Sequence, residues 1–571
     1  MTRQLRGSGG NLTRLTCLLW GAMLVFTNSE AQQASRLPSG TLQRLTQTLK
    51  RIPAAREPVP PPNLSGSLSK GPGAPTQIRA LITQFRFIGN TQVPSEALSA
   101  ALSDLTGGPL TLAEIDQAAE RITALYVSKG YNVARAVIPP QDIVDQSVTL
   151  VVLEGKLQEG GLELVDFSEG QVDLDRISAI LQAQIDLSSP IRRKEYERAL
   201  RLVENLPGVT LKSWLYPGRD IGTARLRTEL YATPKHQNVV ALDNHGYQPT
   251  GAWRTSIDSV HENTWGEHEQ VRLDASVSDA RNVYLGASAQ LPLGTDGWAL
   301  VGQMDHIQYD VRRQFSTNDE HGSAQHLGLG FSYPLQLLSD VSWVTQQTLN
   351  VVRQSDAMQG FDGEQRDVHF LESTVQGDIN WNASGSANTT LRMNLSLGSA
   401  NAPAPELRST QGDFAVLVGD VSHMQALGDG LVWWSQLKAQ TASRHLNGYF
   451  ACTLGGPYSS RAYPTGQVAA DRCIQFNNEL FLQTNATWRF SAFLDWARAR
   501  QTAPGLNGAA MATDTLASAG LSLTAFVRQN DSISLTVARQ LTRSLEREAF
   551  DRDVDKRNAR YRAWLQAQMA F

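Results

Sequence analysis

Two cysteines toward the C-terminal end, Cys452 and Cys473, are the side chains of this sequence best suited to covalent chemistry with each other. A third cysteine, Cys17, lies within the first 31 residues. An even pair forms a disulfide in an oxidising compartment, whereas cytosolic cysteines normally stay reduced. The chemistry of the pair therefore depends on where the chain is sent.

Sequence patterns typical of catalysis are missing. Neither G-x-S-x-G, nor H-E-x-x-H, nor a phosphate-binding loop occurs, and the ten histidines show no spacing typical of metal ligands. The formal net charge of −4 gives no sign of a nucleic-acid-binding protein. We therefore expect no enzyme, no cofactor, no metal site and no nucleic-acid partner.

Residues 1–31 have the parts of a secretory signal peptide. Three arginines precede an apolar stretch at 15–26, and a small-residue cleavage site ends at Ala31. The stretch is shorter than the roughly 18 to 20 apolar residues that a membrane-spanning helix needs. Export would remove the first cysteine and place the other two in an oxidising compartment, so we expect a disulfide between Cys452 and Cys473.

The C-terminal segment 561–571 alternates strictly between two faces. Tyr561, Leu565 and Phe571 lie on the apolar face, whereas Arg562 and other polar residues lie on the opposite face. A membrane-spanning strand of about 9 to 11 residues has this pattern, and only a closed barrel satisfies its backbone in lipid. A half-buried edge strand of a soluble sheet would alternate in the same way, but the export signal favours the barrel.

Between the signal and the first folded unit, the pattern predicts a helix and a linker. Residues 36–52 carry one leucine-rich face and end at a proline, which is typical of an amphipathic helix. Its apolar face either docks on another element or belongs to a frayed surface helix or disordered leader. Residues 53–77 are rich in proline and read as a semi-rigid linker.

Residues 78–155 and 156–235 each show the order β-α-α-β-β, which indicates an internal repeat of two α+β units. In the first unit, a strand is expected at 78–88, and a capping box at Thr111 and Glu114 starts a helix. In the second unit, we expect a helix with Pro190 at its first position. The strand expected at 224–231 alternates charged with apolar residues, which fits either a solvated face or a sheet edge able to bind an extended peptide.

From residue 236 to 571 the helical periodicity stops. Alternating segments separated by turn residues take its place, and tryptophans and tyrosines gather near their ends. The length allows about sixteen antiparallel strands. The fold class predicted is therefore α+β modules followed by an all-β transmembrane barrel.

Several motifs together resemble the outer-membrane transporters of two-partner secretion, the TpsB family of haemolysin secretion/activation proteins. The resemblance covers essentially the whole mature chain. Its most specific segments are Tyr126–Tyr131, Val137–Gln141, Leu242–Gly246, Leu454–Pro464 and Phe493–Asp495.

This resemblance implies roles for individual residues. Family members fold a loop into the barrel, and an arginine of this loop meets an aspartate of a strand; Arg461 and Asp495 occupy these positions, flanked by Tyr463 and Phe493. Ala462 and Ala497 stand where the family has glycines, which puts the conformation of the loop tip in question. The terminal Phe571 is expected to act as an assembly signal for the barrel.

The resemblance also implies a function. The two α+β units would be periplasmic POTRA domains that capture a large partner protein, an adhesin or haemolysin (TpsA-like), in extended form. The barrel, placed in outer-membrane lipid by the barrel assembly machinery, would export this partner without nucleotide, and the helix at 36–52 would plug the pore. The alternatives are an outer-membrane insertase of the same superfamily and a passive diffusion porin.

Overall fold

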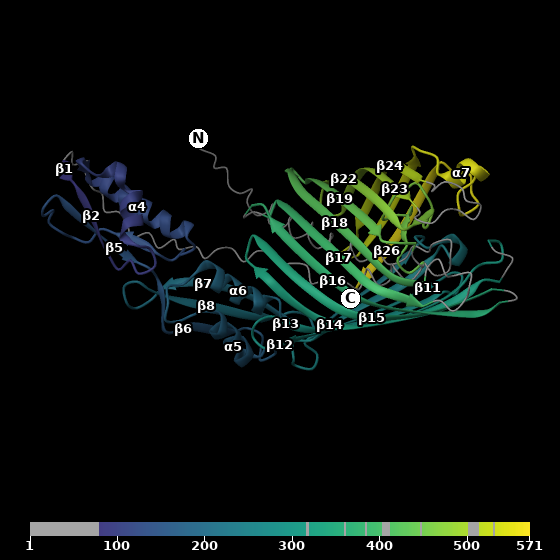
Figure 1. The fold of residues 1–571 in the computed structure, drawn as a ribbon, viewed down its shortest axis with the longest axis horizontal. Coiled ribbons are helices and arrows are strands. Elements are labelled where there is room, and N and C mark those ends of the chain that lie inside the picture. The colour runs from purple at the N-terminus through teal and green to yellow at the C-terminus, as the bar shows by residue number, and fades with distance from the viewer. Residues whose placement is uncertain are drawn as a thin grey trace, which may run out of the picture.

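The computed structural model describes residues 79–315, 319–358, 361–382, 385–401, 411–445, 448–500, 513–528 and 531–571. The predicted signal peptide, amphipathic helix and linker lie outside the described residues. Figure 1 shows an elongated molecule, with one α+β unit at an end, a second unit beside it, and a large barrel next to the second unit. Among the described residues, no helix is long and apolar enough to cross a membrane.

The first unit packs three helical segments on two small sheets. Its elements are β1 (Arg79–Ile82), β2 (Gln84–Ile88), α3 (Ser95–Ala101), η3 (Ser103–Leu105), β3 (Gly108–Thr111), α4 (Leu112–Ser128), β4 (Arg135–Val137) and β5 (Ser147–Leu153). The predicted capping box is present, because the Thr111 hydroxyl accepts from the Glu114 N–H and the Glu114 carboxylate accepts from the Thr111 N–H. Tyr126, fully buried on α4, donates to Glu154 at 2.8 Å and joins the helix to the end of the unit.

The prediction of a single strand at 78–88 is wrong in the number of strands. This segment forms two strands, because β1 pairs with β3 whereas β2 pairs in parallel with β5. Ile82 and Phe85 are both buried, three positions apart, so the two-residue alternation of a strand cannot continue through Thr83.

The second unit repeats the order with β6 (Lys156–Asp166), α5 (Leu174–Gln184), α6 (Arg193–Glu204), β7 (Val209–Pro217) and β8 (Thr223–Ala232). The expected helix start at Pro190 is wrong, since α6 begins at Arg193. The segment before it is tied to the sheet: Pro190 bridges Lys156, and the Ile191 N–H donates to the Gly155 carbonyl at 2.9 Å.

The interpretation of β8 as a peptide-binding edge is also wrong. The strand order is β6-β8-β7, so β8 is the central strand and both of its edges are already paired. Its charges lie on a partly exposed sheet face, where Arg227 approaches Glu163 at 3.7 Å and Glu229 at 3.2 Å. The solvated-face interpretation therefore holds for these residues.

Sixteen of the remaining strands form a closed antiparallel barrel, as predicted. Their bounds are β9 (His236–Asp243), β10 (Arg254–Glu262), β11 (Gln270–Ser278), β12 (Val283–Leu293), β13 (Trp298–Asp310), β14 (His321–Leu337), β15 (Val341–Met358), β16 (Phe361–Asn380), β17 (Ala387–Asn401), β18 (Gly412–Gly428), β19 (Leu431–Ala442), β22 (Arg472–Gln483), β23 (Trp488–Arg500), β24 (Thr513–Phe526), β25 (Ser532–Gln540) and β26 (Tyr561–Ala570). Along β23 every second side chain is exposed, so that Leu494 lies outside and Asp495 inside. This alternation matches an apolar outer surface around a polar interior.

The last strand closes the barrel against the first. β26 pairs with β25 on one side and with β9 on the other, where Gln566–Ala570 lie opposite Asp243–Val239. Phe571 extends the pairing, since its N–H donates to the Asn238 carbonyl and its carbonyl accepts from the Asn238 N–H, both at 3.0 Å. The C-terminal residue is thus part of the seam.

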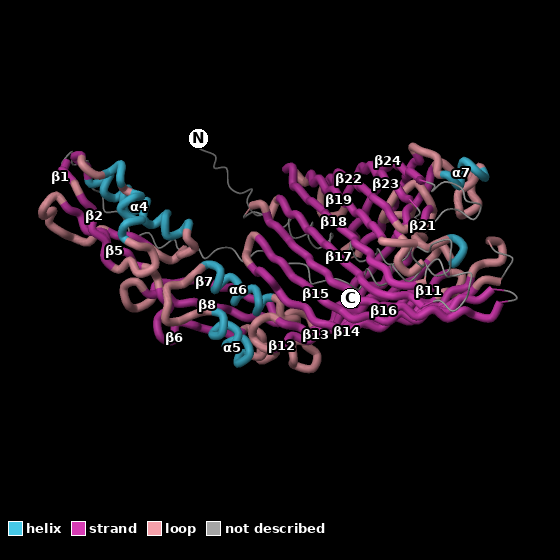
Figure 2. The backbone as a smooth tube through the Cα atoms, viewed as in Figure 1, coloured by secondary structure: helices cyan, strands magenta, loops and turns pink. Residues whose placement is uncertain are grey.

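The second unit is docked on the turns at the adjacent end of the barrel. Arg198 of α6 donates to the carbonyls of Pro334 at 3.1 Å and Asp296 at 3.0 Å. On the same face, His268 of the β10–β11 turn is fully buried, with Nδ1 3.0 Å from the Pro207 carbonyl. Figure 2 shows that the helices of the two units lie toward this end of the barrel, whereas the short α7 (Leu545–Phe550) lies at the opposite end.

Candidate functional site

The loop between β19 and β22, residues 443–471, folds back into the barrel. Its two arms pair as the short strands β20 (Cys452–Leu454) and β21 (Val468–Ala470). Between them, Ser460, Ala462 and Tyr463 are fully buried although they belong to a loop. This burial means that the tip of the loop is enclosed by the barrel wall.

Arg461 at the tip is held by carboxylates of two neighbouring strands. Its Nε and Nη2 donate to Asp495 of β23, at distances of 2.8 to 3.2 Å. Its Nη1 donates to Glu479 of β22 at 2.6 Å, and its backbone N–H donates to Asp495 at 3.0 Å. A guanidinium fork bound in this way fixes both the position and the orientation of the loop tip.

Asp495 is itself fixed by further donors. Its side chain is completely buried and accepts from Asn477 Nδ2 at 2.8 Å and from Ser518 Oγ at 2.9 Å. Phe493, two residues earlier, places its ring centroid 3.5 Å from the Arg461 guanidinium carbon. The wall therefore offers the arginine two charged partners and an aromatic face.

Tyr463 anchors the other side of the tip. Its hydroxyl donates to the Thr542 carbonyl at 2.6 Å and also lies 3.3 Å from the Ala517 carbonyl. The structure therefore brings together Arg461, Asp495, Phe493 and Tyr463, the residues that the sequence motif singled out. Phe571 lies apart from them, at the β9–β26 seam.

The two alanines that replace family glycines fit the backbone without strain. Neither Ala462 nor Ala497 is among the residues with positive φ in the described part of the chain, although Gly455 and Gly456 just before the tip are. Both alanine side chains are fully buried. The loop tip therefore needs no glycine at position 462, and β23 needs none at position 497.

Cys452 and Cys473 are paired in a disulfide, with their Cα atoms 6.3 Å apart. The bond joins β20, in the stem of the loop, to the start of β22 in the wall. Nearby, His445 Nδ1 lies 3.0 Å from the buried carboxylate of Asp471. The disulfide thus attaches one arm of the stem to the barrel wall, and the contact of His445 with Asp471 joins the two arms of the loop to each other.

Sequence reasoning missed several partners of the loop. Glu479 was not predicted, nor was Trp564 of β26, whose indole N–H donates to the Arg461 carbonyl at 2.7 Å. Arg547 and Gln540, around the β25–β26 loop, were missed as well. Strand alternation places Glu479 and Trp564 on the inner face, but only the register of distant strands shows what they touch.

Comparisons with known proteins agree with this architecture. A family model described as haemolysin secretion/activation protein ShlB/FhaC/HecB matches residues 225–551, and a ShlB-type POTRA domain model matches residues 80–155. The chain belongs to the ShlB/FhaC/HecB family. The predicted membership of the TpsB transporters is confirmed, and with it an outer-membrane barrel whose POTRA domain lies in the periplasm.

Relatives of this TpsB protein include transporters named for different cargoes. The heme/hemopexin transporter protein HuxB of Haemophilus influenzae (strain 86-028NP) is 23% identical over 476 residues, covering 80% of this chain and 82% of the relative. The hemolysin transporter protein ShlB of Serratia marcescens is 23% identical over 270 residues, covering 46% of each chain. Among solved structures, CdiB from Escherichia coli covers both chains fully with a TM-score of 0.70 at 16% identity, which shows a shared fold.

Proposed function

We propose that this TpsB transporter exports one large partner protein, an adhesin or haemolysin, in extended form and without nucleotide. Membership of the family supports transport of a secreted partner across the outer membrane. The observation that supports a gated route is the buried loop tip, held by Arg461 between Asp495 and Glu479. A loop tip held by charged groups and hydrogen bonds can be released from the wall without unfolding the barrel.

The other parts of the chain take supporting roles in this proposal. The POTRA domain and the second α+β unit would receive the partner in the periplasm, and the helix at 36–52 would rest in the pore until transport begins. The barrel assembly machinery would place the barrel in the outer-membrane lipid. Arg461, Asp495, Tyr463 and Phe493 would hold the loop in its transport-competent position.

The test is co-expression with a candidate partner in a strain that lacks other two-partner systems. A suitable partner is a long secreted protein with an N-terminal filamentous-haemagglutinin-like domain, preferably from the neighbouring reading frame. We expect this partner in the medium only when the transporter is present. If other outer-membrane barrels are lost when the transporter is deleted, the insertase alternative is favoured, and solute uptake without secretion would favour a porin.

A further inference from the structure

The loop that joins β25 to β26, residues 541–560, contains a group of buried charges at the end of the barrel remote from the second α+β unit. Arg547 and Asp553 belong to this loop and lie 3.2 Å apart. Asp555 follows in the loop, and Arg562 belongs to the inner face of β26; these two lie 2.9 Å apart. Their side chains are between 0 and 8% exposed, so two arginines and two aspartates form a charge-balanced group away from water.

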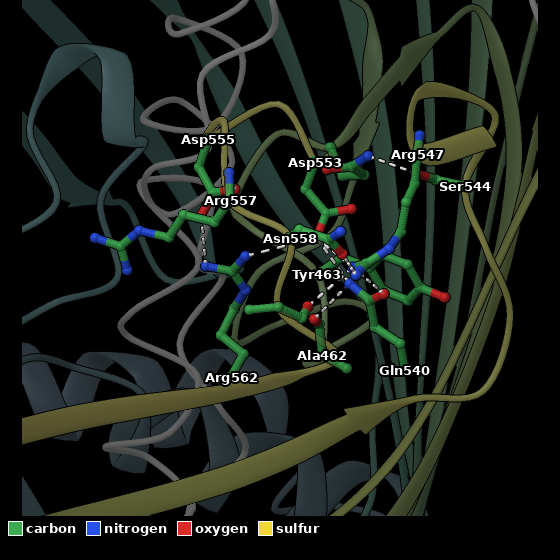
Figure 3. Close-up of polar contacts among 12 residues, drawn as sticks. Ala462, Tyr463, Gln540, Ser544, Arg547, Asp553, Asp555, Arg557, Asn558 and Arg562 are labelled. Carbon is green, nitrogen blue, oxygen red and sulfur yellow. Dashed lines mark hydrogen bonds and ion pairs between the residues drawn. The ribbon is translucent and has the colours of Figure 1, made fainter. Parts of the chain in front are cut away.

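The group ties the loop to itself and to the closing strand. Arg547 Nη1 donates to Gln540 at 2.8 Å and to the Ala559 carbonyl at 2.9 Å, and Nη2 donates to Asn558. Figure 3 shows Arg547, Gln540 and Asp553 converging, while Arg562 reaches Asp555 from the strand below. Both ends of the loop are therefore fixed to one charged centre.

The same centre holds the buried tip of the 443–471 loop. Gln540 Nε2 bridges the two, because it donates to Asp553 at 2.9 Å and to the Ala462 carbonyl at 3.2 Å. Further along, Gln467 Nε2 donates to Ser544 Oγ at 2.7 Å, and the Gln467 side-chain oxygen accepts from the Val554 N–H at 3.3 Å. Hydrogen bonds thus join the 443–471 loop to the 541–560 loop and its neighbouring strand on both sides of the tip.

Stability alone does not account for this arrangement. Buried ion pairs pay a desolvation cost that often equals their attraction, so apolar residues would stabilise a purely structural loop at least as well. Asp553 Oδ1 and Arg562 Nε are buried and have no hydrogen-bond partner among the residues that the structure describes, so the network is incompletely satisfied there. A charged contact of this kind fixes one arrangement and still separates when its members become hydrated.

We propose that Arg547 and Arg562, with Asp553 and Asp555, are positioning residues for transport. They hold the 541–560 loop as a clasp over the 443–471 loop, so that the outer end of the pore stays closed until the two loops separate. This inference rests on the proposed function. It adds a further set of contacts that holds the loop, distinct from the contact of Arg461 with Asp495.

The first test measures single-channel conductance of the full-length protein in planar bilayers without any partner. Asp553→Asn and Arg562→Gln should each raise the mean conductance or the open probability several-fold, while heat modifiability shows a folded barrel. Arg552→Ala removes an exposed charge from the same loop and should behave like wild type. Wild-type conductance in both folded charge variants would overturn the proposal.

A second test stays informative if those variants fail to assemble. The double variant Gln467→Cys/Ser544→Cys, joined by a short thiol-reactive crosslinker that reductant cleaves, should stop partner secretion and regain it on reduction; reductant on wild type controls for the native disulfide. Unchanged secretion with complete crosslinking would show that the loops need not separate. If wild type secretes no partner at all, the proposed function fails, whereas a failure confined to the crosslinked variant concerns the clasp.

Discussion

Trp564 donates its indole N–H to the backbone carbonyl of Arg461 at 2.7 Å, which links the strand that closes the barrel to the tip of the buried loop. The tryptophan is 5% exposed and contributes to the inner wall. The loop is therefore positioned by the closing strand as well as by β22 and β23. A displacement of the tip breaks its contacts to β22, β23 and β26, and also those to Ala517 of β24 and Gln540 of β25.

The contribution of this single bond can be measured with Trp564→Phe, which keeps an aromatic ring and removes the donor. A buried carbonyl left without its partner costs about 1 to 3 kcal/mol. We expect a folded barrel with raised basal conductance and reduced secretion. Trp433→Phe, an outward-facing position, serves as the control. Equal conductance in the two variants would show that the loop does not depend on this bond.

Arg461→Ala and Asp495→Ala should each greatly reduce secretion of the partner while the barrel still assembles. Removing one member of a buried ion pair leaves the other charged and unpaired, which costs about 3 to 5 kcal/mol. Arg461→Lys should rescue poorly because lysine cannot reach Asp495 and Glu479 with a planar fork. Secretion is measured by immunoblot of the medium against surface levels of the transporter. Normal secretion by both alanine variants would contradict the proposed role.

Cys452→Ser/Cys473→Ser should lower the resistance of the loop to protease without preventing assembly. In the chain-entropy model, closing a loop of this length restricts the unfolded chain by roughly 3 kcal/mol. The measurement is the rate of extracellular protease cleavage on whole cells. Labelling of both cysteines in denatured, unreduced wild-type protein would show that no disulfide forms.

Deleting Phe571 should lower the amount of assembled transporter in the outer membrane. The residue makes two backbone hydrogen bonds to Asn238, so its loss shortens the pairing of β26 with β9. Replacement by Tyr should preserve both bonds and most of the assembly. Outer-membrane fractions and heat modifiability give the readout, and full assembly of the deletion would exclude an assembly role for this residue.

Docking of the second α+β unit on the barrel should weaken as the pH falls. Burial lowers the pKa of His268, and Arg176 adds to this, while the Pro207 carbonyl, Asp173 and Glu269 act in the opposite direction. An exposed histidine has a pKa of about 6.5. The separated state binds a proton that the docked state resists. The free energy of docking therefore has its full value above this pH and falls by up to about 1.4 kcal/mol per pH unit below it.

The matching experiment follows the distance between spin labels on the second unit and a barrel turn from pH 7.5 to 5.5. The distance distribution should broaden toward low pH in wild type. His268→Gln, which cannot be protonated, should remove the pH dependence. A wild-type distribution that does not change over this range would contradict the prediction.

Local patterns in the sequence predicted local structure well. The alternation at 561–571 gave the closing strand, and the Thr111–Glu114 pair gave the start of α4, because both signals depend only on neighbouring residues. The start of α6 was predicted wrongly because Pro190, a good first helical residue in isolation, is used by a bridge to Lys156. That bridge joins distant segments and leaves no local trace.

The residues of the functional site show the same difference between local signals, which could be predicted, and contacts between distant segments, which could not. Arg461 and Asp495 were predicted together through a motif resemblance, whereas Glu479, Trp564 and Gln540 were missed. Their contacts depend on the register of strands and on how far a loop reaches into the barrel. Neither quantity follows from alternation within a single strand.

The strands differ greatly in length around the barrel. β9, β10 and β11 have 8, 9 and 9 residues, close to a bilayer span, whereas β15 and β16 have 18 and 20. Crossing a membrane takes about 9 to 11 residues, so part of β15 and β16 extends beyond the bilayer. Arg353 and Asp367, exposed on the outer surface and 3.0 Å apart, show that the surface of this additional length is polar. β15 and β16 therefore project well beyond the membrane surface, whereas β9, β10 and β11 end close to it, so the rim that the strands form is strongly uneven.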